Sequence, residues 1–208
     1  MNKFATVIMA AAAAALLVTA CSKSDDSAEE QSTGTGIKVG FSQVGAESDW
    51  RKASTESIKE AAKLKNINLT FSDAQQKQEN QIKAIRNFIT KGVDVISFSP
   101  VVATGFEDVL KEAKEAGIPV VLFDRAVDVS EDGLYVSFIG SDFVEEGRRA
   151  ARWVLENVGE NANVAELVGT VGSAPAIDRK KGFEEIIKDH PGIKIIKSQS
   201  HGEHLYKC

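Results

Sequence analysis

The feature that most constrains the fold is a regular alternation between short apolar runs and amphipathic stretches. From residue 37 onward, runs of strand length are separated by stretches with hydrophobic residues at helical spacing, such as Ile82, Ile85 and Ile89. The predicted strands cover residues 37–41, 68–71, 93–98 and 119–124, and the predicted helices cover residues 49–64, 78–91 and 106–116. This alternation predicts an α/β fold in which parallel strands are joined by right-handed helical crossovers, forming a doubly wound lobe.

Local signals indicate where the helices begin and end. Asp49 is of the type that accepts hydrogen bonds at a helix start, and we expect it to be the N-cap of the first helix. Gly92 and Gly117 follow the second and third predicted helices, where a left-handed backbone cap is favoured.

The same rhythm restarts after a polar connection at residues 126–133. Its predicted elements are strands at 135–139, 164–168 and 193–196 and helices at 142–157 and 176–188. We expect them to form a second doubly wound lobe that begins near residue 128. Residues 201–208 have neither helical nor strand periodicity.

Residues 1–20 have the layout of a secretory signal peptide. A basic start, Met1–Lys3, precedes an Ala-rich apolar segment, and small residues then lead to Cys21. This end resembles the lipobox of bacterial lipoproteins, which implies cleavage before Cys21 and a lipid on its sulfur. The alternative is an ordinary signal peptide. Residues 21–36 are polar and acidic, so we expect a flexible tether there.

Composition and motifs exclude several classes of function. The net charge of -5 argues against nucleic acid as a partner. No apolar run beyond the N-terminal one is long enough to span a membrane. The chain lacks the Gly-rich dinucleotide fingerprint, the phosphate-loop Gly-Lys-Ser/Thr and the Gly-x-Ser-x-Gly elbow. We therefore expect neither an enzyme nor a bound cofactor.

Two weaker patterns have alternative interpretations. His201, His204 and Cys208 have a spacing that can chelate a metal, but a terminal tail offers no second shell of supporting residues, so we expect no metal site. Gly169–Ser173 lies between a predicted strand and a predicted helix. A phosphate loop is conceivable there, and a tight turn is the favoured interpretation.

Polar residues follow the predicted strands of the first lobe. The strand at 119–124 ends in Asp124-Arg125, which pairs a carboxylate acceptor with a guanidinium donor. Open α/β sheets bind ligands beyond these carboxyl ends, so the pair can fix hydroxyls of a small polar ligand; the alternative is a structural ion pair. Trp50 and Arg51 follow the first strand's loop. The indole can stack on a sugar ring, or it can be a core residue. Arg179 can donate from the second lobe, or it can be a solvated helix residue.

Specific motifs recur through residues 37–200. They are Gly40–Gly45 with Glu47, Trp50-Arg51, Gln75–Ile82, Pro100–Gly105, Asp124-Arg125, Gly169–Gly172, Ala176–Phe183 and Ser198–Ser200. In these motifs the chain resembles the ribose-type periplasmic sugar-binding proteins, the solute receptors of ABC importers. The resemblance implies two doubly wound lobes, joined by three crossovers, that close on a monosaccharide like a hinge.

The resemblance also implies site residues and partners. Ser42, Glu47, Trp50 and Arg51 fall on the first lobe's ligand loop, Asp124 and Arg125 match the acid–arginine pair at the strand tip, and Arg179 matches the second lobe's arginine. The implied partners are a monosaccharide, an ABC permease in the inner membrane, and the membrane itself through a lipid on Cys21. No nucleic acid, cofactor or turnover is implied, and the implied location is the periplasm. The alternatives are a receptor for a membrane sensor and the ligand core of a sugar-responsive regulator.

The chain also departs from the family. The resemblance ends at Ser200, whereas the family continues with a helix and strands that supply further ligands and complete the first lobe. We expect a truncated or frameshifted product with impaired sugar binding. Its predicted parts are a first lobe at residues 37–127 without its returning segment, a partial second lobe at 128–200 and an unrelated tail at 201–208.

Overall fold

A six-stranded sheet forms the first lobe in the computed structural model, which describes residues 30–31 and 36–200. The strand order is β1-β3-β2-β4-β5-β6, and every pairing is parallel except that of β1 with β3. The strands are β1 (Glu30–Gln31), β2 (Lys38–Gln43), β3 (Asn68–Asp73), β4 (Val95–Phe98), β5 (Val120–Asp124) and β6 (Ser137–Gly140). The predicted α/β class is confirmed.

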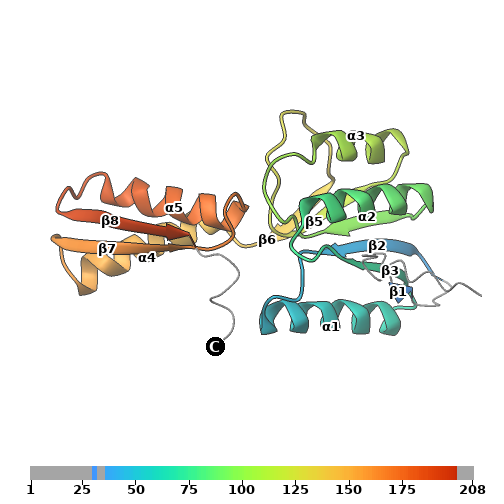
Figure 1. The fold of residues 1–208 in the computed structure, drawn as a ribbon, viewed down its shortest axis with the longest axis horizontal. Coiled ribbons are helices and arrows are strands. Elements are labelled where there is room, and N and C mark those ends of the chain that lie inside the picture. Colours follow the sequence, from blue (N-terminus) through green and yellow to red (C-terminus); the bar gives the residue numbers. More distant parts are fainter. Residues whose placement is uncertain (1–29, 32–35, 201–208) are drawn as a thin grey trace, which may run out of the picture.

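Three helices cover this sheet on both faces. Helix α1 (Asp49–Leu64) lies on one face, and α2 (Gln78–Thr90) and α3 (Glu107–Glu115) lie on the other (Figure 1). The larger core lies under α2 and α3, where Phe88, Phe98 and Phe106 are fully buried. Each buried phenylalanine contributes about 1.5–3 kcal/mol by leaving water, so this core holds the strand ends in place.

The predicted helix caps are confirmed except at the first helix. Gly92 and Gly117 have φ of 59° and 70°, so both predicted left-handed caps are confirmed. The predicted N-cap Asp49 is wrong: Ser48 is the N-cap, and its side chain accepts a hydrogen bond from the backbone nitrogen of Arg51. Ser48 has the extended backbone that an N-cap requires, whereas Asp49 is already the first helical residue.

The predicted start of the second lobe near residue 128 is wrong. Strand β6, expected to open the second lobe, pairs in parallel with β5 from Val121↔Ser137 to Asp124↔Gly140. The connection after Arg125 returns over α3, where Ser130 bonds to Glu107, and so brings β6 back to the first sheet. The first lobe therefore extends to Gly140.

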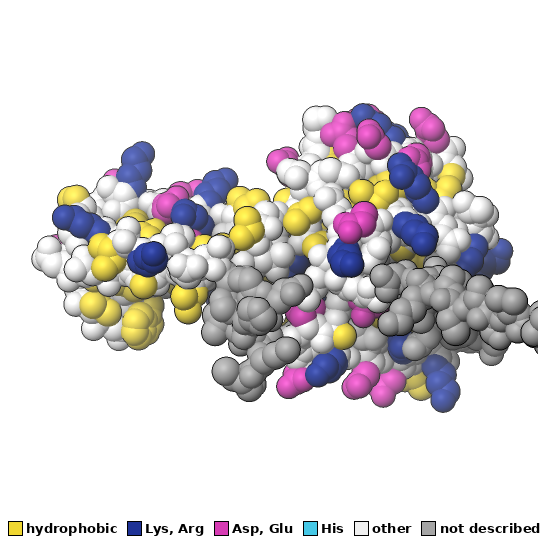
Figure 2. All heavy atoms as spheres, in the orientation of Figure 1, with side chains coloured by type: hydrophobic (Ala, Val, Ile, Leu, Met, Phe, Trp, Pro, Cys, Tyr) yellow, Lys and Arg dark blue, Asp and Glu magenta, His cyan; other side chains and the backbone are white. Residues whose placement is uncertain are grey.

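The second lobe consists of α4 (Phe143–Asn157), β7 (Ala162–Val168), α5 (Ala174–Ile187) and β8 (Ile193–Ser200). Strands β7 and β8 are parallel, and β8 continues past its predicted end at residue 196. Leu167 and Ile196 are 74% and 63% exposed on this sheet, and hydrophobic side chains are visible on this lobe in Figure 2. The described residues thus leave one face of the second sheet uncovered.

The predictions for the two ends of the chain fall mostly outside the described residues. The predicted signal peptide, Cys21 and the tail at 201–208 all lie there. Within the predicted tether, Glu30 and Gln31 form β1 and pair with Phe71 and Thr70 of β3, so this part of the tether adds a strand to the sheet. In the described part of the chain, every helix is too short or too polar to cross a bilayer.

Candidate functional site

Asp124 occupies a strained turn at the carboxyl end of β5. Its φ is 64°, in the left-handed region, and the backbone nitrogen of Arg125 donates to the carbonyl of Phe123 at 2.7 Å, closing a γ-turn around it. A non-glycine residue held there costs about 1–3 kcal/mol. The surrounding contacts must offset this strain, and they converge on the Asp124 carboxylate.

The guanidinium of Arg51 is the centre of these contacts. Its Nη2 lies 2.7 Å from Asp124 Oδ2, and its Nε lies 3.2 Å from Glu47 Oε1. Its Nη1 donates to Gln43 Oε1 at 3.4 Å and to Ser99 Oγ at 3.3 Å. The Arg51 side chain is only 5% exposed. These protein partners engage most of the guanidinium's donors, so Arg51 chiefly organises the acids around it.

Glu47 and Trp50 both contact this guanidinium. Glu47 Oε1 accepts from Arg51, whereas the buried Oε2 has no hydrogen-bond partner among the described residues. Trp50 is 56% exposed and carries the Arg51 guanidinium 4.8 Å from its ring centroid. The core interpretation of Trp50 is therefore wrong, because a core indole would be buried. The site retains an acceptor and an indole surface for a ligand.

Ser42 is a strand residue and does not belong to the loop where it was predicted. It lies within β2, opposite Ser72 of β3 and Phe98 of β4, because the parallel pairing continues to the end of that strand. Its side chain is fully buried, and its Oγ has no hydrogen-bond partner among the described residues. Ser42 is joined to the Arg51 cluster through its backbone alone, since its carbonyl accepts from the backbone nitrogen of Ser99 at 3.1 Å.

Arg125 extends the site toward the second lobe. Its Nη1 donates to the carbonyls of Pro100 and Val101 at 3.4 and 3.1 Å, and its Nε lies 3.8 Å from Asp124 Oδ2. Asp124 and Arg125 therefore form a long ion pair, and the closer partner of Asp124 is Arg51, at 2.7 Å. Arg125 also lines a cavity whose other walls come from the second lobe.

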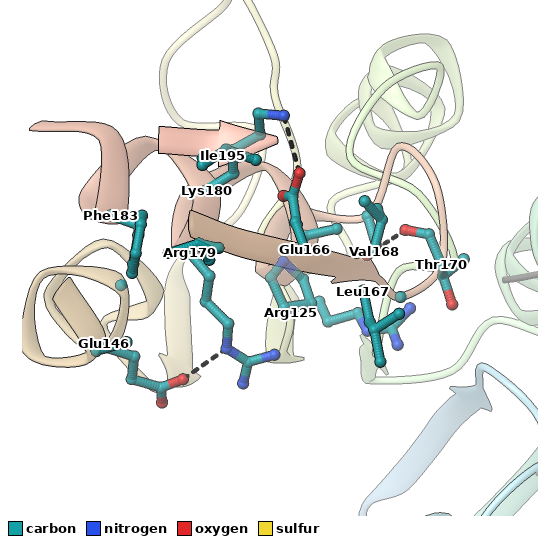
Figure 3. A pocket seen from close by; sticks show the side chains of 17 residues that line it. Arg125, Glu146, Glu166, Leu167, Val168, Thr170, Arg179, Lys180, Phe183 and Ile195 are labelled. Carbon is teal, nitrogen blue, oxygen red and sulfur yellow. Dashed lines mark hydrogen bonds and ion pairs between the residues drawn. The ribbon is translucent and has the colours of Figure 1, made fainter. Parts of the chain in front are cut away.

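This cavity, shown in Figure 3, brings Arg125 and Arg179 to one space of about 560 Å³. Arg179 Nε contacts Glu146 Oε2 at 2.8 Å, and its guanidinium stacks 4.7 Å from the ring centroid of Phe143. Arg179 is half-exposed and forms a surface ion pair with Glu146. It also lines the cavity. Ligand sites typically occupy roughly 300–1,000 Å³, a range that includes this space.

Glu166 adds an ionised acceptor to the cavity wall. The hydroxyl of Ser198 donates to it at 2.6 Å, and the ammonium of Lys180 lies 3.0 Å away. The Ser198 hydrogen bond, followed by Lys180, holds the pKa of Glu166 below its ordinary value. The cavity therefore combines charged donors and acceptors with an apolar wall that includes Leu167, Phe183 and Ile195, a surface suited to a ligand with both polar and apolar parts.

The Gly169–Ser173 loop is a tight turn, as favoured from the sequence. Ser173 donates to the carbonyl of Thr170 through both its backbone nitrogen and its hydroxyl, and Gly172 has φ of 79°. The Gly172 carbonyl accepts from the backbone nitrogen of Ala103 at 2.8 Å, which joins the two lobes. Across residues 36–200, no cluster of His, Cys, Asp or Glu has the arrangement of a metal site.

Sequence reasoning missed Gln43 and Ser99, which are both fully buried. Gln43 accepts from Arg51 and donates to Ser54 and Thr55, and Ser99 donates to Asp124 at 3.3 Å. One available signal was their position, since each is a polar residue at or just after the end of an apolar strand.

Comparison with known proteins places these residues in a family context. The pattern of the periplasmic binding protein domain matches residues 39–205. The chain is 55% identical over 165 residues to the galactofuranose-binding protein YtfQ of Escherichia coli, covering 79% of this chain and 52% of that protein. The chain thus spans about half the length of this curated relative.

Solved structures share the arrangement. The periplasmic component of an arabinose ABC transporter from Shewanella, bound to α- and β-L-arabinofuranose, is 52% identical with a TM-score of 0.76. The match covers 80% of this chain and 55% of the chain in that structure. A protein from Mycobacterium smegmatis in complex with β-D-fucofuranose is 54% identical with the same TM-score, at coverages of 81% and 56%. Both neighbours hold five-membered sugar rings.

Proposed function

This chain belongs to the periplasmic binding protein family, and we propose that it is a solute-binding protein that holds one monosaccharide and presents it to an ABC permease. The observation that carries the proposal is the position of Asp124. Its backbone is strained, and Arg51 binds its carboxylate at the ligand-binding edge of a doubly wound sheet. The function rests on binding and domain closure, without turnover.

The sugar is proposed to be a furanose. This choice is supported by the arabinofuranose and fucofuranose in the two solved neighbours and by the name of the Escherichia coli relative. A five-membered ring offers an apolar edge and several adjacent hydroxyls, and the site offers an exposed indole beside charged acceptors and donors. The chemistry of the two surfaces is therefore complementary.

Each predicted site residue receives a proposed role. Trp50 stacks on the ring, while Asp124 and the second oxygen of Glu47 accept from sugar hydroxyls. Arg51 and Arg125 donate to sugar oxygens, and Arg179 donates from the second lobe. Ser42 lies at the floor of the site, where its buried hydroxyl has no hydrogen-bond partner among the described residues. Acceptors and donors can then bind neighbouring hydroxyls of one ligand, which favours a sugar over a ligand with a single polar group.

The family implies a periplasmic location, and we extend the proposal to a membrane anchor. Cleavage before Cys21 would leave its sulfur for a lipid, and residues 22–29 would connect the anchor to the first lobe, whose sheet begins with β1. Replacing Cys21 with Ser should release the protein from the membrane fraction of an expressing bacterium. Continued sedimentation of the Cys21→Ser protein with the membrane would contradict the anchor.

Saturation-transfer NMR tests the sugar site directly, since it detects weak binding. The full chain is titrated with L-arabinose, D-galactose and D-fucose, whose solutions contain furanose forms. Asp124→Asn is the matched variant, because Asn tolerates the left-handed backbone while losing the charge. We expect transfer to at least one sugar in the wild-type chain and about tenfold weaker binding in the variant.

The control for this titration is Asp108→Asn, which removes an exposed carboxylate from the first turn of α3. It should bind as the wild-type chain does. Equal binding by the Asp124 and Asp108 variants, or no transfer to any sugar from the wild-type chain, would refute the proposed site.

A further inference from the structure

One short segment, Ser99–Val101, contacts three residues of the proposed site. The Ser99 hydroxyl lies within hydrogen-bond distance of both Arg51 Nη1 and Asp124 Oδ2. The carbonyls of Pro100 and Val101 accept from Arg125. A shift of this segment would therefore move Arg51, Arg125 and the Asp124 carboxylate together.

A single side chain from another element holds this segment at both ends. Gln81, on α2, donates from Nε2 to the carbonyl of Ser99 at 2.7 Å. Its Oε1 accepts from the backbone nitrogen of Val101 at 2.9 Å. Gln81 is fully buried and shares the buried face of α2 with Ile85 and Phe88. An amide among hydrophobic residues is costly unless both of its ends are bonded, and here both are.

We propose that Gln81 is a positioning residue for sugar binding, which fixes the Ser99–Val101 segment and through it the donors and acceptors of the site. This inference rests on the proposed function. Gln81 lies behind the segment, so it acts through Ser99 and Arg125 and does not touch the sugar. The amide supplies one donor and one acceptor together, which a hydrophobic side chain cannot do and a carboxylate can do only when protonated.

Three variants separate this role from simple packing. Gln81→Leu keeps a side chain of similar size and removes both hydrogen bonds. Gln81→Glu keeps the acceptor and regains the donor only when protonated, and burial raises the pKa of such a carboxyl. Asn80→Ala is the matched control, because Asn80 is the neighbouring α2 amide and bonds to the Ala74 carbonyl outside the segment.

Two readouts are taken from the full chain. The first is the Nε–H NMR signals of Arg51 and Arg125, recorded without sugar. The second is the affinity for whichever of the three sugars binds the wild-type chain. We expect Gln81→Leu to shift both arginine signals and to weaken binding by about tenfold, as expected for the loss of two buried hydrogen bonds. Gln81→Glu should recover both readouts as the pH falls, whereas Gln81→Leu should not.

The outcomes distinguish this inference from the function on which it rests. Absence of binding in the wild-type chain would overturn the proposed function, whatever the arginine signals do. Arginine signals that stay unchanged in folded Gln81→Leu, or that shift equally in Asn80→Ala, would overturn the positioning role. A Gln81→Glu chain without pH-dependent recovery would also overturn it, because a purely structural loss would not respond to protonation.

Discussion

At the scale of single residues, burial distinguishes the ion pairs around Arg51 from those on the surface of the described chain. The same N–O distance of 2.7 Å occurs between Arg51 and Asp124 and between Arg86 and Glu112. The first pair has exposures of 5% and 19%, whereas the second has 54% and 40%. The two pairs share this distance in unequal surroundings, and Arg86 also bonds to Glu112 through Nε at 2.9 Å. The exposed pair, which has the fuller contact, is therefore a stringent reference for the effect of burial.

Arg51→Met should lower the free energy of unfolding by about 3 kcal/mol, because it leaves the Asp124 carboxylate largely buried without its main partner. Arg86→Met should leave it nearly unchanged, since water screens an exposed pair. Urea denaturation of both variants measures the two values. Similar losses in the two variants would show that burial does not set the strength of the Arg51 pair.

At the scale of elements, the connection from β5 to β6 is fastened to helix α3. Glu107 accepts from the backbone nitrogen of Ser130 at 2.9 Å and from its hydroxyl at 2.8 Å, and it contacts Lys111 at 2.7 Å. The Lys111 bond, followed by the two bonds from Ser130, lowers the pKa of Glu107 from 4.5 to about 2. This carboxylate holds the segment that returns β6 to the first sheet.

Because the pKa of Glu107 is lowered in the folded chain, its stabilising effect is present above pH 4.5 and is lost as the pH falls toward about 2. Glu107→Gln should therefore lower the Tm at neutral pH, and its difference from wild type should vanish across that interval. Thermal scans from pH 7 to about pH 2 measure this difference. Glu115→Gln, an exposed change on the same helix, controls for loss of a surface charge, and an equal pH dependence there would contradict the assignment.

Helices α4 and α5 cross closely because each presents a glycine to the other. A Cβ on Gly182 would overlap the Val144 carbonyl, and one on Gly147 would overlap the Arg179 carbonyl. Gly182→Ala should cost about 1–3 kcal/mol, as overpacking does. A Cβ on Gly169 would meet no other atom within 4 Å, so Gly169→Ala is the control in urea denaturation. Equal midpoints would show that the crossing can relax.

The periodicity of the sequence was enough to locate nearly every helix and strand, since apolar spacing reflects which side of an element is buried. It could not assign β6 to a sheet, because the residues of this strand are exposed and their pattern does not indicate which strand they pair with. It also missed Gln43, Ser99 and Gln81, whose roles depend on contacts between elements far apart in the chain. Asp124 and Arg51 were found because polar residues that follow apolar strands lie at a ligand-binding edge.

At the scale of the whole molecule, the lobes meet where the Gly169–Ser173 turn touches the loop after β4. Gly172 accepts a hydrogen bond from Ala103, and a Cβ on Gly172 would lie 3.9 Å from the Cβ of Val102. This contact adjoins the cavity of the proposed sugar site, because Thr170 and Ser173 of the same turn line it. Any movement of one lobe against the other that closes on a ligand must either keep this contact as a pivot or break it.

A disulfide across this contact tests whether ligand closure keeps the contact as a pivot or breaks it. Cβ atoms joined by a disulfide lie roughly 3.5–4.5 Å apart, so Val102→Cys with Gly172→Cys should form a cross-link under mild oxidation once Cys21 and Cys208 are replaced by Ser. The left-handed backbone at Gly172 makes its Cys somewhat strained, at a cost of about 1 kcal/mol. If closure breaks the contact, as we expect, sugar should reduce the radius of gyration of the reduced chain in solution scattering and leave the oxidised chain unchanged. An equal reduction in both forms would make the contact a pivot and contradict that expectation.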